Sequence, residues 1–235
     1  MIIFENTEVV GWEAAIRGMR NPMNSWEKSD TQFYDYGEHW TLSDSQGYTA
    51  TGVYIGLNDH DLMMRLAKAG SEHAKYRRMI VAYVDITAPL YWWKEFDTYK
   101  VGTVANSCST MHKIAEKEFT LKDFSTDHLE SLYVVSGDNA CDGYAFIGNL
   151  CSTIRVLNLA RSMYLKTKDK CYWWQMIQLL PSSYNQRRTV MMNYEVLANI
   201  YRQRQSHKLD EWQVGFMEWI ESLPYSEIIT GKEKK

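Results

Sequence analysis

The chain has 235 residues, of which 45% are hydrophobic, and it includes nine Trp and sixteen Tyr. This composition supplies enough apolar surface for one packed core, so we expect a single domain over residues 1–235. The formal charge of −3 at pH 7 gives no electrostatic reason to expect a nucleic-acid polymer as partner, because its phosphates demand a clustered basic surface. A mononucleotide needs only one or two cations, so the net charge does not exclude it as a ligand.

The sequence has no membrane or metal signature. No apolar run reaches the ~18 residues that span a bilayer, and the N-terminus lacks a basic region followed by a long apolar stretch. We therefore expect a cytoplasmic protein without a membrane partner. The four cysteines show no CxxC spacing, so we interpret them as reduced thiols and not as a zinc site or disulfide frame: Cys108, Cys141, Cys151 and Cys171.

The N-terminal half alternates helical and extended patterns. Apolar residues at helical spacing between Trp12 and Met19 predict a helix that ends at the Asn21-Pro22 turn. Residues 31–56 are expected to form loop and short strands. A second helix is predicted from residue 59, with Asn58 or Asp59 as its N-cap and Gly70 at its end.

A strand over residues 79–86 follows, closed by Pro89, because its residues are β-branched or aromatic. Helical spacing returns over residues 90–99, and a polar stretch occupies residues 100–113. Residues 119–149 are the least periodic part and are expected to be a variable loop or insertion.

The C-terminal half is predicted to be helical, over residues 154–165, 172–180, 189–205 and 209–222. One or two strands with helices on either side predict an α+β domain with a small central sheet flanked by helices. No GxGxxG or Walker motif is present, so the sequence does not predict either of the two commonest phosphate-binding loops.

Two polar residues fall on the apolar stripe of the helix predicted over residues 189–205. Its spacing aligns Asn193 and Arg204 with Leu197 and Ile200. One interpretation is that the two side chains cap or bridge neighbouring helices. The other is that an amide and a guanidinium point together into a pocket, where the guanidinium binds a phosphate or a pyrimidine edge.

This region resembles the C-terminal end of flavin-dependent thymidylate synthases. That family has a Leu-Pro turn, a helix with two asparagines six residues apart, an arginine five residues further on, and then a His and a Glu. The chain has the same series in Leu180-Pro181, Asn193, Asn199, Arg204, His207 and Glu211. The resemblance implies that the two asparagines contact the flavin and that the arginine contacts the nucleotide.

A second stretch resembles the family in its framework but not in its signature. The helix ending at Gly70, the loop with His73, the strand and Ala88-Pro89 follow the family order. The family then has an Arg-His-Arg triplet, a Ser after seven residues, and an Arg-Tyr pair two residues beyond. Here those positions hold Thr98-Tyr99-Lys100, Cys108 and Thr110-Met111.

The resemblance assigns two groups of residues. On the cofactor side it implies Asn193, Asn199, His73, Lys100 and Asn106, the last standing where the signature has a Glu. On the substrate side it implies Arg204, Cys108, Thr110 and Gln178. Arg77 and Arg78 are either replacements for the lost phosphate contacts or a solvated pair, and His73 is either near the flavin or on the surface.

Two functions follow from the resemblance. The first is a flavin-dependent thymidylate synthase-like enzyme, a homotetramer with FAD, NADPH and methylenetetrahydrofolate, that transfers a one-carbon unit to C5 of a pyrimidine deoxynucleotide such as dUMP. The second is a catalytically altered or inactive protein that binds or sequesters a nucleotide on the same fold, since fold does not decide chemistry. The missing triplet favours the second function, and the Asn/Asn/Arg series favours retained ligand binding.

Overall fold

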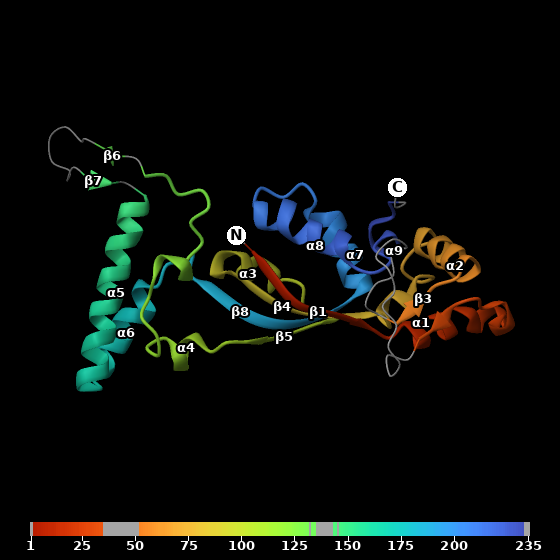
Figure 1. Cartoon of the computed structure of the whole chain (residues 1–235), viewed down its shortest axis with the longest axis horizontal. Coiled ribbons are helices and arrows are strands. Elements are labelled where there is room, and N and C mark those ends of the chain that lie inside the picture. The colour runs from red at the N-terminus through yellow and green to blue at the C-terminus, as the bar shows by residue number, and fades with distance from the viewer. Residues whose placement is uncertain (1, 35–51, 132, 135–142, 145, 233–235) are drawn as a thin grey trace. The chain divides into compact units, whose positions relative to one another are not determined.

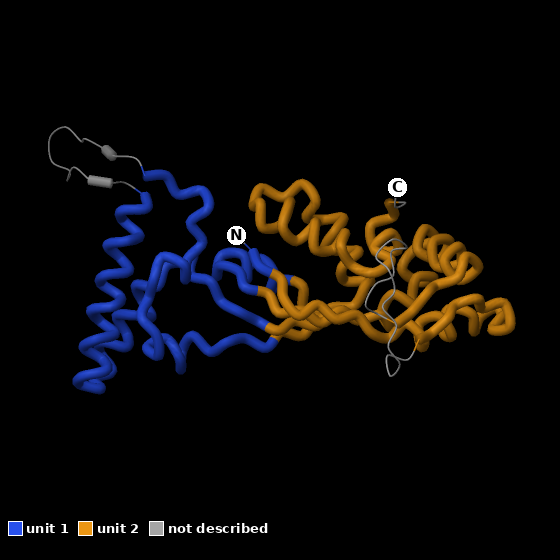
Figure 2. Tube along the Cα trace, viewed as in Figure 1, with its two compact units in different colours: residues 1–3, 87–98, 106–188 blue, residues 4–86, 99–105, 189–235 orange. Residues whose placement is uncertain are grey.

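The computed structural model describes residues 2–34, 52–131, 133–134, 143–144 and 146–232. The chain divides into two compact units, coloured separately in Figure 2. Unit 1 consists of residues 1–3, 87–98 and 106–188, and unit 2 consists of residues 4–86, 99–105 and 189–235. That the whole chain folds as one domain stays a prediction.

A four-stranded sheet has the strand order β1-β4-β8-β5 (Figure 1). Its strands are β1 (Ile3–Val10), β4 (Val81–Pro89), β8 (Asn185–Asn193) and β5 (Thr103–Ser107). The α+β class with a small central sheet is confirmed. The expectation of one or two strands is wrong, since this sheet has four. Strands β1 and β5 escaped prediction because they are mostly exposed and lack the apolar pattern that identifies a strand.

Asp85 connects three neighbouring strands through its carboxylate. Its Oδ1 accepts a hydrogen bond from Thr189 Oγ1 on β8 at 2.6 Å, and its Oδ2 accepts from Asn6 Nδ2 on β1 at 2.9 Å. A shift of one residue in β4 would turn this carboxylate to the opposite face of the sheet. The two hydrogen bonds therefore fix the register of β4 against both neighbours.

Unit 1 is built on two packed helices, α5 (Ile147–Thr167) and α6 (Lys170–Leu179), as the sequence predicted. Leu157 and Met176 are completely buried in their core. The other elements of the unit are α3 (Leu90–Phe96), α4 (Thr110–Lys113), the 3-10 helix η5 (Leu121–Asp123) and the paired strands β6 (Tyr133–Val134) and β7 (Gly143–Tyr144).

The segment 119–149, expected to be a variable loop or insertion, begins with packed residues. Phe119 and Phe124 are buried in the core of unit 1. The amide of Asn158 accepts a hydrogen bond from the Phe119 N–H at 2.8 Å and donates one to its carbonyl at 2.9 Å. Residues 132, 135–142 and 145 lie outside the described residues. The first part of this segment thus belongs to the core of the unit.

Unit 2 contains most of the short helices. Its elements besides the sheet strands are α1 (Trp12–Arg20), η1 (Asn21–Met23), η2 (Trp26–Lys28), β2 (Gln32–Phe33), β3 (Val53–Tyr54), α2 (Leu57–Lys68), η4 (Lys75–Arg78), α7 (Tyr194–Arg204), the π-helix η6 (Glu211–Phe216), α8 (Met217–Ser222) and α9 (Glu227–Thr230). The core includes Trp12, whose ring meets that of Tyr194 edge-on at 5.5 Å. The Tyr194 hydroxyl donates to the Pro224 carbonyl at 2.7 Å, which satisfies a buried polar group.

The N-cap of α2 differs from the prediction of Asn58 or Asp59. The N-cap is Gly56, and the carboxylate of Asp30 accepts hydrogen bonds from the backbone N–H groups of Asn58 and Asp59 at 2.9 and 3.1 Å. Asp59 is instead completely buried, where it accepts a hydrogen bond from Arg20 Nε at 2.6 Å. A carboxylate distant in sequence supplies the cap, so local spacing gave no sign of it.

Candidate functional site

The segment from Thr189 to Asn193 is a strand, so the prediction of a helix beginning at Thr189 is wrong. Val190 and Met192 are buried while Thr189 is exposed, which is the alternation of a strand. Helix α7 begins only at Tyr194, and the side chain of Asn193 caps it by accepting a hydrogen bond from the Val196 N–H at 2.9 Å. The capping interpretation of Asn193 is therefore confirmed.

A pocket of about 610 Å³ in unit 2 contains both asparagines of the predicted series. We call it the asparagine pocket. It is lined by Ala67, Gly70, Ser71, Arg77, Arg78, Val101, Gly102, Asn193, Glu195, Val196, Asn199 and Arg202. Residues from the end of β8, from α7 and from the basic 3-10 helix η4 thus meet in one cavity within the range of about 300–1,000 Å³ typical of ligand sites.

Both asparagines of this pocket have amide donors that the protein leaves unused. The Oδ1 of Asn193 is used in capping α7, and the Oδ1 of Asn199 accepts from Arg202 at 2.5 Å. Within the described residues, neither Nδ2 group donates to a protein acceptor. An acceptor-rich ligand would therefore complement the pocket.

Arg77 places a buried positive charge in the asparagine pocket. Its side chain is 10% exposed and lies 3.5 Å from the carboxylate of Glu195, which is 9% exposed. The Nε of Arg77 is buried and has no hydrogen-bond partner within the described residues. Burying such a donor without a partner is costly, which makes the Arg77 side chain an energetically demanding part of this pocket wall.

Gly102 leaves room for Asn193 in the wall of this pocket. Its φ of +74° is a conformation that favours glycine, and an added Cβ would approach Asn193 Nδ2 and Val196 Cγ2 to 2.9 Å. The sequence reasoning missed Gly102, Glu195 and Arg202. A Gly within a polar stretch after a predicted helix was the available signal for the first of these.

Arg204 does not line the asparagine pocket. Its Nε donates to the Tyr99 hydroxyl at 2.7 Å, and its guanidinium carbon lies 5.0 Å from the ring centre of Trp212. Arg204 therefore bridges two neighbouring segments, those of Tyr99 and Trp212, as one of the two interpretations of the sequence predicted. Its cation lies against both aromatic rings. Its contact with a nucleotide stays a prediction.

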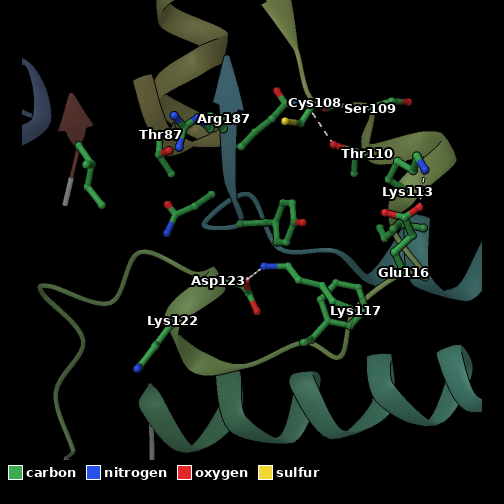
Figure 3. Close-up of a pocket in the computed structure, with 16 residues that line it drawn as sticks. Thr87, Cys108, Ser109, Thr110, Lys113, Glu116, Lys117, Lys122, Asp123 and Arg187 are labelled. Carbon is green, nitrogen blue, oxygen red and sulfur yellow. Dashed lines mark hydrogen bonds and ion pairs between the residues drawn. The ribbon is translucent and has the colours of Figure 1, made fainter. Parts of the chain in front are cut away.

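A second pocket, of about 440 Å³, lies in unit 1 and contains Cys108 and Thr110 (Figure 3). We call it the lysine cavity. Its lining is Ile3, Thr87, Cys108, Ser109, Thr110, Lys113, Ile114, Glu116, Lys117, Phe119, Lys122, Asp123, Tyr184, Asn185, Gln186 and Arg187. The amide of Gln186 donates to the Cys108 carbonyl and to Thr110 Oγ1, both at 3.0 Å, and so fixes this segment to β8.

Both carboxylates that line the lysine cavity form ion pairs with lysines of the same cavity. Lys113 pairs with Glu116, and Lys117 pairs with Asp123 (Figure 3). The hydrogen bond with Asp123 raises the pKa of Lys117. Burial opposes ionisation of Asp123, but hydrogen bonds from Lys117 and Thr120 outweigh it and lower the pKa of this carboxyl. Both groups are therefore charged at neutral pH.

The remaining predicted site residues lie elsewhere on the surface. His73, Lys100, Asn106 and Gln178 are exposed and line neither pocket. The structure thus brings Asn193 together with Asn199, and Cys108 together with Thr110. Cys108 is a free thiol, as are Cys151 and Cys171, and Cys141 lies outside the described residues.

The described residues contain neither a membrane-spanning helix nor a cluster of metal ligands. No helix among them has the length and hydropathy that crossing a bilayer requires. Nor do they gather three or more His, Cys, Asp or Glu side chains in the manner of a metal site.

The fold is similar to solved structures, although no protein-family model and no curated protein matches the sequence. Thymidylate Synthase X (ThyX) from Helicobacter pylori, solved with FAD and dUMP, has 16% identity and a TM-score of 0.62 over 97% of this chain and 94% of that chain. The UMP/dUMP methylase PolB from Streptomyces cacaoi, bound with 5-Br dUMP, has 15% identity and a TM-score of 0.57 over 98% and 95%. The chain therefore has the fold of ThyX and PolB along nearly its whole length.

Proposed function

We propose that the protein is a flavin-dependent thymidylate synthase-like protein that binds a pyrimidine deoxynucleotide such as dUMP, together with FAD. One observation carries this proposal. Asn193 and Asn199, assigned to the flavin from sequence resemblance, line one pocket with three arginines, on a fold shared with a protein solved with FAD and dUMP. A cytoplasmic location and a homotetramer belong to the same proposal.

The asparagine pocket fits the chemistry of a flavin dinucleotide. The two phosphates of FAD require cations, and Arg77, Arg78 and Arg202 line the pocket. The flavin ring carries carbonyl oxygens and ring nitrogens that accept hydrogen bonds, and the amide groups of Asn193 and Asn199 supply donors. These residues support the interpretation of Arg77 and Arg78 as replacements for lost phosphate contacts.

The residues of the chain position the ligands and form no covalent bond. The asparagine pocket would hold the flavin, which would supply two-electron redox chemistry between NADPH and the one-carbon unit of methylenetetrahydrofolate. Asn193 and Asn199 hold and orient the flavin through their Nδ2 groups. Arg204 neutralises and orients the nucleotide, with its side chain kept in place by Tyr99 and Trp212.

A second candidate function is a nucleotide-binding or sequestering protein whose redox chemistry is altered or lost. The specific observation in its favour is the triplet Thr98-Tyr99-Lys100 in place of Arg-His-Arg. Thr98 carries no charge where the family has its first arginine, and Tyr99, at the His position, contacts Arg204 as a hydrogen-bond acceptor.

The absorbance spectrum of freshly purified protein distinguishes the two functions, with mass spectrometry of any ligand released on denaturation. A flavin band, or uptake of added FAD with a spectral shift, is expected for the enzyme. Assays with dUMP, methylenetetrahydrofolate and NADPH would then detect the methylated nucleotide. A colourless protein that takes up no FAD but binds dUMP would establish the second function.

A further inference from the structure

Both asparagines of the asparagine pocket are held by their side-chain oxygen. Asn193 Oδ1 accepts a hydrogen bond from the Val196 N–H at 2.9 Å, and Asn199 Oδ1 accepts one from Arg202 Nη2 at 2.5 Å. Among the described residues, the buried side-chain atoms that lack a hydrogen-bond partner include neither Nδ2. Each amide therefore commits its oxygen to the protein and leaves its nitrogen accessible to a ligand.

The two amides differ in what fixes their orientation. The partner of Asn193 is a backbone group in the first turn of α7. The partner of Asn199 is the side chain of Arg202, which is itself held on α7 because its Nε donates to the Ala198 carbonyl at 3.3 Å. The planar guanidinium is thus aligned by two contacts. One exposed arginine therefore decides which end of the Asn199 amide remains available.

The orientation of an amide determines which ligand atoms it recognises. An asparagine side chain whose oxygen has no partner can turn over about its Cβ–Cγ bond and so exchange a donor for an acceptor. For Asn199 the same rotation would break a charge-assisted hydrogen bond with Arg202. Its amide is therefore fixed as a donor, in the same sense as that of Asn193, and the pair selects ligand atoms that accept hydrogen bonds.

We propose that Arg202 is a positioning residue that fixes Asn199 as a hydrogen-bond donor and thereby makes the asparagine pocket favour the oxidised flavin over the reduced flavin. Reduction converts the ring nitrogen N5 of a flavin from an acceptor into an N–H donor, so an amide fixed as a donor matches the oxidised ring better. The flavin rests on the proposed function, whereas the orientation of the Asn199 amide follows from contacts within α7. This role is additional to the charge that Arg202 contributes to the pocket lining.

Nuclear magnetic resonance of the full chain without added ligand tests the orientation. A cation bound to Oδ1 strengthens the double-bond character of the amide C–N bond and slows the rotation of its N–H2 group. In Arg202→Met this rotation is expected to become about fivefold faster for Asn199, while the amide of Asn193 serves as an unchanged internal reference. Met and Arg have similar helix propensities, so α7 is expected to stay folded. Equal rotation rates of Asn199 in the wild-type protein and the variant would overturn the positioning role.

The reduction potential of FAD added to the protein tests the selectivity. Arg202→Met is expected to raise it by about 30 mV, which corresponds to a tenfold change in the ratio of affinities for the oxidised and reduced flavin in a two-electron couple. Loss of a cation alone would lower the potential, because the reduced flavin carries more negative charge. The sign of the shift therefore separates the effect of the amide from the effect of the charge.

The matched control is Arg78→Met, which removes an equal charge from another exposed arginine of the same pocket lining. It is expected to cause no rise in the potential. Arg202→Lys keeps a charged donor and should retain the wild-type value. A rise in both Met variants, or in neither, would overturn the selectivity.

A double-mutant cycle identifies the amide as the group through which Arg202 acts. In the Asn199→Ala background no amide remains to be oriented, so adding Arg202→Met is expected to give no rise in the potential. The same rise in this background as in the wild-type background would assign the effect of Arg202 to another group and contradict the proposal.

These outcomes are separable from those of the proposed function. A protein that takes up no FAD would overturn the proposed function and the preference for oxidised flavin together, while the rotation rate of the Asn199 amide would still decide whether Arg202 orients it. Uptake of FAD with the same potential in the wild-type protein and in Arg202→Met would retain the proposed function and remove Arg202 from the control of the flavin.

Discussion

The side chain of Arg204 donates a hydrogen bond from Nε to the hydroxyl of Tyr99 at 2.7 Å. In the proposed resemblance, Tyr99 stands at the middle position of the triplet Thr98-Tyr99-Lys100, and Arg204 stands at the arginine position of the C-terminal series. Tyr99 also donates to Gln203 Oε1 at 3.1 Å, so its hydroxyl is oriented from both sides. The two segments that carry the resemblance are therefore in direct contact.

Arg204→Ala is expected to abolish measurable dUMP binding without unfolding the protein. Tyr99→Phe removes one acceptor of Arg204 but keeps the ring, so it should weaken binding by about 1 kcal/mol. Titration calorimetry measures both effects, and thermal denaturation checks folding. Tyr83→Phe, at an exposed tyrosine of β4, is the matched control. Unchanged affinity in Arg204→Ala would exclude this residue from the nucleotide site.

Gly102→Ala should impair FAD uptake more than Gly231→Ala. Both glycines have positive φ, +74° and +72°, so both substitutions introduce similar backbone strain. Only the Cβ at position 102 reaches Asn193, whereas nothing lies within 4 Å of one at position 231. The visible absorbance of each variant after incubation with FAD gives the comparison. Equal uptake would show that Asn193 does not hold the flavin.

Asp59→Asn should destabilise the protein by about 3–5 kcal/mol, because it leaves Arg20 as a buried charge without its partner. Asp61→Asn is the control, since the exposed pair with Arg65 contributes little. Burial opposes ionisation of Asp59, but hydrogen bonds from Thr31, Ser29 and Arg20 outweigh it and lower its pKa below 3.8.

That pKa shift predicts how stability depends on acid. The contribution of Asp59 is present above the ordinary carboxyl pKa and is lost as pH falls through the lowered value in the folded state. Urea unfolding at a series of acidic pH values should show a steeper loss of stability for the wild-type protein than for Asp59→Asn. Parallel curves would contradict the role of this carboxylate.

His60 should make stability depend on pH near neutrality. Its hydrogen bond with Glu227 at 2.9 Å raises the pKa of the imidazole above 6.5. The stabilisation is fully present below that ordinary value and is lost as pH rises through the raised value. His60→Gln should flatten the dependence of the unfolding midpoint on pH, whereas His73→Gln, at an exposed histidine, should not. A wild-type midpoint that rises over this interval would refute the prediction.

Sequence periodicity predicted the long elements because their apolar residues face a core. Helices α5 and α6 and the buried strand β4 are examples. The exposed strands β1 and β5 gave no such pattern. The second half of strand β8 was assigned to a helix, because the three apolar residues Val190 to Met192 are compatible with either structure until Asn193 is known to be a cap.

The site was predictable where residues lie close in sequence. Asn193 and Asn199 are six residues apart, so one helix accounts for both. Arg77, Gly102 and Asn185 come from separate segments, and only the tertiary fold shows which pocket each enters. The role proposed for Arg77 also depends on its burial, which no spacing encodes.

The strand order β1-β4-β8-β5 has a consequence for synthesis of the chain. Strand β5 has β8 as its neighbour in the sheet, yet β8 is translated about eighty residues after it. Until β8 has been translated, the backbone N–H and C=O groups of β5 have no partner strand in this sheet. Strands β1 and β4 can already pair at that stage. Assembly of the sheet is completed by a late strand inserted between two early ones, and the same strand delivers Asn193 to its pocket. Ligand binding must accordingly be among the last properties that the nascent protein acquires.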